Sequence, residues 1–129
     1  MIEQILNKYN KTNEAIISKL ETFNLPIFQN TVNADERPEV LNLFIVLYGD
    51  WSTIDDGKRQ LQQDIFITYL SENRDDVDEM VIKVANELQK INLIKFVSSQ
   101  TDYVQKSGTE EYVDRVILRF SRGGGLLEC

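Results

Sequence analysis

The sequence predicts an α+β fold, in which a mostly antiparallel sheet built from two hairpins and a short edge strand packs against two amphipathic helices. Two segments, residues 2–22 and 75–90, carry apolar residues at helical spacing. Other segments are rich in β-branched and aromatic residues, and they fall into two pairs, each joined by a polar, turn-like stretch. Hairpins that alternate with amphipathic helices indicate this layered class, because each helix buries its apolar face on the sheet.

The first segment, residues 2–22, is expected to be a helix with apolar side chains at spacings of three and four. The residues at these spacings are Ile2, Ile5, Leu6, Tyr9, Asn13, Ile16, Ile17 and Leu20, of which Asn13 is the polar member. The polar triplet KTN at 11–13 interrupts the apolar face, so two short helices are the alternative. Pro26 stops the helix, and LPIF at 25–28 predicts a short strand. Because proline has no N–H to donate, this strand is expected at a sheet edge.

The first hairpin is expected to begin with the run from Val40 to Tyr48, which is apolar at nearly every position. Such a run predicts a strand that is covered on both faces and lies at the centre of the sheet. Its partner is expected over residues 61–71, with two alternating faces: Ile65, Ile67 and Tyr69 on one, Phe66 and Leu70 on the other. The stretch GDWSTIDDGKRQ, residues 49–60, then forms the tip of the hairpin.

The second helix has the clearest periodicity of the chain. Its apolar positions are Val77, Met80, Val81, Val84, Ala85 and Leu88. The acidic run at 75–79 lies in its first turns and Lys90 at its end, as the helix macrodipole favours. The helix is therefore expected to pack on the sheet.

The closing hairpin is expected from strands at 91–104 and 110–120, joined by the KSGT turn. The remaining SRGGGLLEC contains three consecutive glycines and no apolar pattern. We therefore expect one α+β domain over residues 1–122 and a flexible arm over residues 123–129.

Length and composition indicate one domain that does not cross a membrane. The 129 residues are 42% hydrophobic and 27% charged, and no apolar run approaches the roughly 20 residues that a bilayer requires. The segment MIEQILNKYN lacks the order of basic, apolar and small residues typical of a secretory signal. We expect a protein that works in the cytosol or in an assembly made there.

The charge and the missing residue types argue against catalysis and against nucleic-acid binding. A net charge of −7 opposes binding to phosphates, which requires a clustered cationic surface. The chain contains no histidine, and its one cysteine is Cys129. The most common general base is therefore missing, and neither an intramolecular disulfide nor a zinc site can form. We expect a protein that is not an enzyme and has no metal ion or other cofactor.

The acidic hairpin tip is the first candidate site for chemistry. Asp50, Asp55 and Asp56 lie close together, but their spacing fits no calcium loop, and Asp56-Gly57 is a common turn pair. A turn with a contact surface is the better interpretation. Trp51 beside it either packs back on the sheet or enters a partner's pocket.

Two further features near the end of the chain are candidates for an interface. Arg119 and Arg122 either bind a phosphate or an acidic neighbour, or alternate as exposed charges with core residues. Leu126 and Leu127 follow the glycine spacer, and they either order on a partner or belong to a frayed tail. The predicted interface residues are Trp51, Asp55, Asp56, Arg122, Leu126 and Leu127.

The order of these elements resembles a known family. It consists of an amphipathic first helix, the LPIF strand, the hairpin VLNLFIVLYGD…LQQDIFITYL, the helix DDVDEMVIKVANELQ and a hairpin ending in DRVILRFSR. Over residues 1–122 this arrangement is similar to the tail terminator, or tail completion, proteins of long-tailed bacteriophages, which join the head to the tail. The resemblance rests on element order, length and apolar pattern.

The resemblance implies a structural role in the virion, at the head-proximal end of the tail, after assembly in the host cytoplasm. Such proteins form a homohexamer ring that caps the tail tube, stops its polymerisation and offers its other face to the head connector or stopper protein. An acidic subunit repeated around a pore would let the genome DNA pass without specific binding. The hairpin tip at 49–60 would then dock on the tube or a neighbour.

Three other functions stay open. A head completion (stopper) protein or a tail tube subunit would share the α+β organisation. A small ligand-binding regulatory module of ferredoxin-like shape uses similar elements and would bind a metabolite between subunits. A carboxylate-dependent nuclease is the third alternative.

Overall fold

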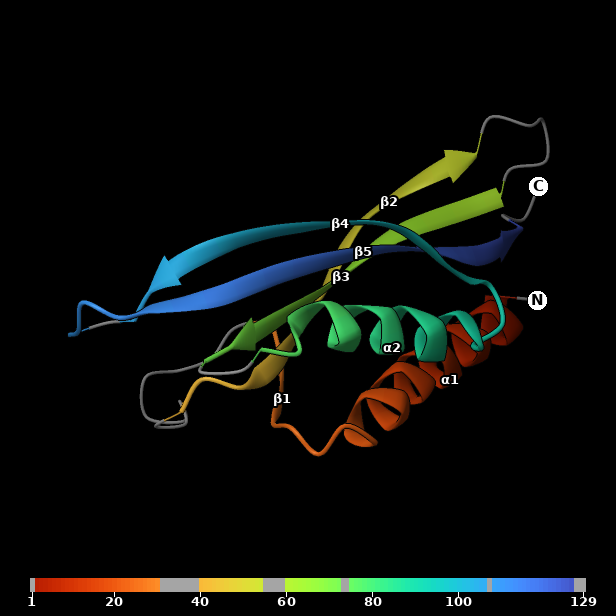
Figure 1. The fold of residues 1–129 in the computed structure, drawn as a ribbon. Helices are drawn as coiled ribbons and strands as arrows, with labels where there is room; N and C mark the ends of the chain where they lie inside the picture. The colour runs from red at the N-terminus through yellow and green to blue at the C-terminus, as the bar shows by residue number, and fades with distance from the viewer. Residues whose placement is uncertain (1, 31–39, 55–59, 73–74, 107, 127–129) are drawn as a thin grey trace.

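The structure, a computed structural model, describes residues 2–30, 40–54, 60–72, 75–106 and 108–126. The elements follow one another along the chain as Figure 1 shows. Their bounds are α1 Ile2–Glu21, β1 Ile27–Gln29, β2 Leu43–Ile54, β3 Gln60–Ser71, α2 Val77–Gln89, β4 Ile94–Gln105 and β5 Tyr112–Leu126. In the described part of the chain, no helix is long and apolar enough to cross a membrane.

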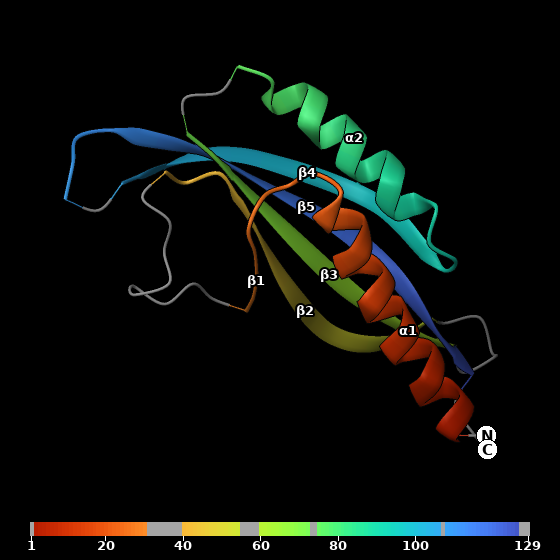
Figure 2. The same ribbon diagram turned by 90° about the horizontal axis from the view of Figure 1, so that it is seen from below.

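The strands form one sheet in the order β1-β2-β3-β5-β4. β1 pairs with β2 in parallel, and all other neighbouring pairs are antiparallel. Both helices lie on the same face of the sheet (Figure 1, Figure 2). The predicted α+β class is therefore confirmed, with the β2–β3 and β4–β5 hairpins joined through the β3–β5 pair.

The edge position of β1 agrees with the missing N–H of Pro26. The carbonyl of Pro26 accepts a hydrogen bond from the N–H of Phe44 at 2.9 Å, so the proline takes part only as an acceptor. β1 then pairs over three residues, Ile27 to Gln29, before the chain leaves the sheet. The prediction of a short edge strand is confirmed.

The central strand is β3, so the prediction that the run from Val40 to Tyr48 lies at the centre of the sheet is wrong. β2 has β3 on one side and only the short β1 on the other. Leu43 and Phe44 are buried on opposite faces at the start of β2, whereas Leu47 further along is 44% exposed. A second apolar cluster, built on Leu41, Leu43 and Val113, explains why the start of this strand is apolar on both faces.

The main core fills the space between the sheet and the helices. α1 contributes Ile16 and Leu20, and α2 contributes Met80, Val84 and Leu88. The sheet contributes Phe44, Val46, Ile65, Ile67, Tyr69, Ile94, Val116, Leu118 and Phe120. Alternate residues of β3 and β5 therefore face the helices, as the period of two predicts.

α1 is one continuous helix of 20 residues, so the KTN triplet does not divide it. The hydroxyl of Thr12 donates to the carbonyl of Lys8, one turn earlier, at 2.8 Å. The side chain of Asn13 is used by Arg122. The polar interruption thus has a structural use on the face of the helix that meets the sheet.

β5 continues to Leu126, so the prediction of a flexible arm is wrong for residues 123–126. The ladder pairs Gly123 with Gln62, Gly125 with Leu61 and Leu126 with Gln60. The N–H of Gly123 also donates to the carbonyl of Leu93 at 3.1 Å. Glycine has a low strand propensity, but the adjacent backbone of β3 supplies hydrogen-bond partners that override this preference.

Candidate functional site

Arg122 is the centre of a buried polar cluster at the end of β5 that lies near the first half of α1. Its side chain is 1% exposed. One terminal nitrogen, Nη1, donates to Asn13 Oδ1 at 2.5 Å and approaches the carbonyl of Tyr9 at 3.5 Å. The other, Nη2, donates to Oε1 of Gln63, the residue opposite Arg122 in the β3–β5 ladder. The amide of Gln63 donates in turn to the carbonyl of Gly49 at 3.0 Å.

Three aromatic rings surround the guanidinium of Arg122. Its central carbon lies 4.3 Å from the ring centroid of Tyr9, 5.4 Å from that of Tyr48 and 5.7 Å from that of Trp51. The rings of Tyr9 and Trp51 also contact each other, with centroids 5.7 Å apart. Cation–π attraction to these rings offsets part of the cost of burying the charge.

The charge of Arg122 has no acidic partner among the described residues. All of its hydrogen bonds there go to neutral oxygens, and its Nε is buried with no acceptor. Burial lowers the pKa of Arg122 from the usual arginine value, and the hydroxyls of Tyr9 and Tyr48 oppose this shift. A guanidinium remains charged at neutral pH even so. The site is therefore a buried positive charge in an acidic protein.

A pocket of about 290 Å³ lies next to this cluster. Its walls are mostly apolar, with Ile5 and Leu6 of α1, Trp51, Leu61 and Leu93. The charged residues that line it, Lys8 and Arg122, are both cationic. A neighbouring shallow groove shares Lys8, Thr12 and Leu93 with the pocket and adds Lys11. Among the described residues, no acidic side chain lines either hollow, in a chain whose net charge is −7.

The structure brings together two of the predicted interface residues, Trp51 and Arg122. Trp51 packs its ring on Tyr9 of α1 and is still 42% exposed, and contact with a partner stays a prediction. Asp55, Asp56 and Leu127 lie outside the described residues. The backbone of Leu126 belongs to β5, as described above.

The two arginines near the end of the chain differ in their surroundings. Arg119 is exposed and pairs with Asp64 across β3 and β5 at 3.1 Å, as a surface charge does. Arg122 points to the opposite face, among the residues of the core. The alternation of Val116, Leu118, Phe120 and Arg122 could have predicted this, because every second residue of a strand shares a face. Tyr9 and Asn13 fall at the helical spacing of the first helix, but no pattern predicts that they or Gln63 contact Arg122.

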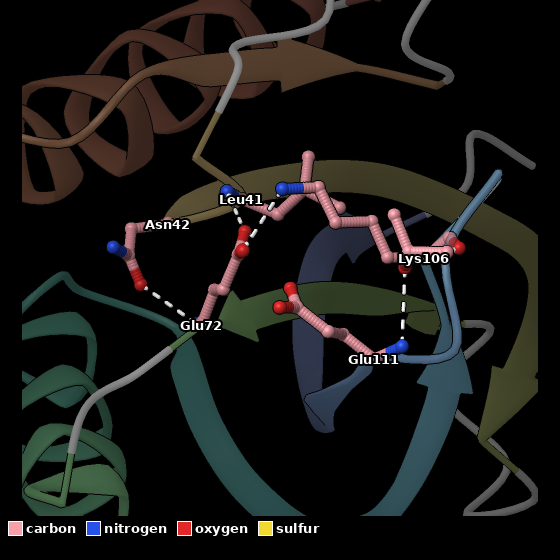
Figure 3. Close-up of polar contacts among 6 residues, drawn as sticks. Leu41, Asn42, Glu72, Lys106 and Glu111 are labelled. Carbon is pink, nitrogen blue, oxygen red and sulfur yellow. Dashed lines mark hydrogen bonds and ion pairs between the residues drawn. The ribbon is translucent and has the colours of Figure 1, made fainter.

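A second buried charge, Glu72, ties the hairpin end of the sheet to β2. Glu72 is 6% exposed. Its carboxylate accepts the N–H of Leu41 at 2.6 Å and pairs with Lys106 Nζ at 2.9 Å, and its own N–H donates to Asn42 Oδ1 at 2.9 Å (Figure 3). The hydrogen bond from Leu41 and the charge of Lys106 lower the pKa of Glu72. The polar groups of this network bond to one another within the chain. We therefore assign the network to the stability of the fold.

The turn end of the β4–β5 hairpin carries two strongly exposed tyrosines. It extends past the first turn of α2 (Figure 1, Figure 2). Tyr103 is 70% exposed and Tyr112 is 67% exposed, and both face the helix side of the sheet. Asp102 and Arg115 pair across the hairpin through two contacts, at 2.8 and 2.6 Å, which stiffen it.

Neither cluster resembles a metal centre. In the part of the chain that the structure describes, no three acidic, histidine or cysteine side chains gather closely enough to hold a metal ion. No known family model matches this chain, and a sequence search of curated proteins finds no match either.

Proposed function

We propose that this protein is a phage tail terminator, a structural subunit that forms a ring, caps the tail tube and joins it to the head connector. The sequence resemblance suggests this role, and six copies are the expected number. The fold class agrees with it, because the resemblance implies the same order of helices and hairpins that the chain has.

The observation that carries the proposal is the free edge of β4. In the described part of the chain, no strand pairs with the outer edge of this twelve-residue strand, and most of its side chains are exposed. A long unpaired edge is a ready surface for another chain, and soluble proteins usually shorten, charge or cover it. The opposite edge, β1, has only three residues. In the described part of the chain, the β4 edge is therefore the longest continuous free edge, while on the other side β1 pairs with only Phe44 to Val46 of β2.

Assembly of identical acidic subunits also fits the passage of DNA. Each copy carries a net charge of −7, so a ring multiplies the negative charge around its pore. A pore lined by negative potential repels phosphates, which lets DNA slide through without binding.

The test is negative-stain imaging and solution mass of the pure protein, alone and with purified tail tubes. The proposal expects rings with six-fold symmetry that sit on tube ends and stop tube growth. Filaments formed by the pure protein would instead indicate a tube subunit. Binding to connectors but not to tubes would indicate a head completion protein, and a compact monomer indifferent to both would contradict the proposal.

A further inference from the structure

We propose that copies of this protein associate head to tail, with the end of the β4–β5 hairpin of one copy seated in the Arg122 pocket of the next. The proposal rests on the self-association in the proposed function and names the two surfaces that meet. The hairpin end is defined by Tyr103, Glu110, Glu111 and Tyr112, and the pocket by Leu6, Lys8, Trp51, Leu93 and Arg122.

The pocket requires a partner that is both apolar and acidic. Leu6 and Leu93 are 53% and 50% exposed at its mouth, so apolar area is available to be covered. Below them lies the guanidinium of Arg122, which has no carboxylate among the described residues, with Lys8 at the rim. A carboxylate brought close to these two cations would relieve a buried uncompensated charge, which is costly when isolated.

The hairpin end has the complementary composition. Glu110 and Glu111 are exposed, and neither makes an ion pair in the described part of the chain. Tyr103 and Tyr112 lie diagonally across the two strands on one face, since Gln105 pairs with Tyr112. Large, exposed aromatic side chains are the typical anchors of protein interfaces. The Asp102–Arg115 pair stiffens the hairpin, so the hairpin loses little conformational entropy when it docks.

The two surfaces cannot meet within one molecule. Each surface includes one residue of β5, Tyr112 in the hairpin end and Arg122 in the pocket, and ten residue steps separate these two. At roughly 3.3 Å per residue the two ends are about 33 Å apart. Figure 1 shows the hairpin and the end of β5 at opposite ends of the sheet. Contact between them therefore joins two copies through unlike surfaces, and repetition of such a contact closes a ring when the rotation allows it.

The test uses one variant of each surface, chosen so that the core is untouched. The hairpin variant is Glu111→Lys with Tyr112→Ser, and the pocket variant is Leu6→Glu with Lys8→Glu, all at exposed positions. The control is Ile82→Glu, which replaces a 69% exposed apolar residue of α2 outside both surfaces. Analytical ultracentrifugation gives the association constants, and circular dichroism verifies the fold of every variant.

We expect each surface variant to raise the dissociation constant about tenfold or more, as loss of a central contact does, and the control to leave it unchanged. A mixture of the two variants retains one intact hairpin and one intact pocket. It should form a one-to-one pair of 15.0 kDa chains, although each variant alone stays monomeric. Trp51, the one tryptophan of the chain, should shift its emission to the blue in that pair, because the docked hairpin shields it.

The outcomes separate this inference from the proposed function. Folded surface variants that assemble as tightly as the unmodified protein, or a mixture that stays monomeric, overturn the inference and leave the tail-terminator proposal standing. If both variants block assembly but the unmodified rings ignore tail tubes, the inference stands and the proposed function falls. An unmodified protein that is monomeric at every concentration contradicts both.

Discussion

At the scale of single residues, the buried Arg122 bonds to neutral partners. Its side-chain partner on α1 is Asn13, which can be replaced without changing the backbone of the helix. Replacing Asn13 with Ala deletes the 2.5 Å bond from Nη1. Hydrogen bonds to charged groups contribute about 1.5–3 kcal/mol to stability. The higher helix propensity of alanine offsets a few tenths of a kcal/mol of that loss. We expect Asn13→Ala to lower the free energy of unfolding by about 1–2 kcal/mol in urea titrations.

Asn86→Ala is the matched control for this change, because Asn86 is an exposed residue of α2 and only the propensity gain applies there. Equal stability of the two variants would show that the bond from Asn13 to Arg122 contributes nothing.

Glu72 makes stability depend on pH. Its pKa is lowered in the fold, so the unfolded chain binds its proton at higher pH than the folded protein does. Stability from Glu72 is therefore present above the unfolded pKa, about 4.3, and is lost as the pH falls through the folded value. Glu72→Gln should cost about 1–3 kcal/mol at pH 7, and the difference from the unmodified protein should shrink steadily below pH 5.

Denaturant unfolding between pH 7 and pH 3 measures this effect. Glu79→Gln serves as the control, since Glu79 forms an exposed i,i+4 pair with Lys83 and surface pairs of that kind contribute little. A constant difference between Glu72→Gln and the unmodified protein across the whole pH range would contradict the assignment.

At the scale of the elements, Gly49 of β2 and Gly123 of β5, two strands that β3 separates, are expected to differ in how well they tolerate alanine. A Cβ added to Gly49 would lie 2.9 Å from the carbonyl oxygen of Asp64 and 3.1 Å from the ring of Phe66. Among the described residues, a Cβ added to Gly123 would meet only Leu93, at 3.8 Å, an ordinary contact. We expect Gly49→Ala to destabilise by about 1–3 kcal/mol and Gly123→Ala to be neutral or slightly stabilising. Thermal unfolding of both variants checks this contrast, and a destabilising Gly123→Ala would count against the extension of β5.

The elements also show what the sequence could predict. Periodicity located both helices and all strands, because apolar spacing follows directly from which face is buried. It misplaced the centre of the sheet, because the second cluster behind Leu43 makes a strand next to the edge as apolar as a central one. It also ended β5 too early, since Gly123 belongs to the sheet through the backbone of β3 and not through its own side chain. Pairing partners are non-local, and spacing along the chain does not reveal them.

The same limit applies to the candidate site. Trp51 and Arg122 were selected from residue type and position, and the structure places their side chains around a common pocket. Asn13 and Gln63, which hold the guanidinium, come from segments 50 residues apart. Amides in a helix and a strand are common, so only the fold shows that these two meet.

At the scale of the whole molecule, two electrostatic effects compete in self-association. Each copy has a net charge of −7, so copies repel one another over distances that the Debye length sets. That length is about 30 Å at 0.01 M salt and about 8 Å at 0.15 M, so moderate salt removes most of the repulsion. Contacts of Lys8 and Arg122 with Glu110 and Glu111 would be short and partly buried, and these are screened far less. Added salt therefore strengthens association if it screens the long-range repulsion more than the short contacts.

We expect association to strengthen between 0.01 and 0.15 M salt, as measured by sedimentation equilibrium. Lys8→Gln makes the net charge more negative and removes one contact, so it should weaken association at both salt concentrations, and more strongly at 0.01 M, where the added repulsion is not screened. Lys83→Gln changes the net charge equally on an exposed part of α2 and serves as the control. It should weaken association only at low salt, because its effect is long-range. Steady weakening of the unmodified assembly over this range would mean that exposed ion pairs hold the copies together and that the buried guanidinium of Arg122 does not.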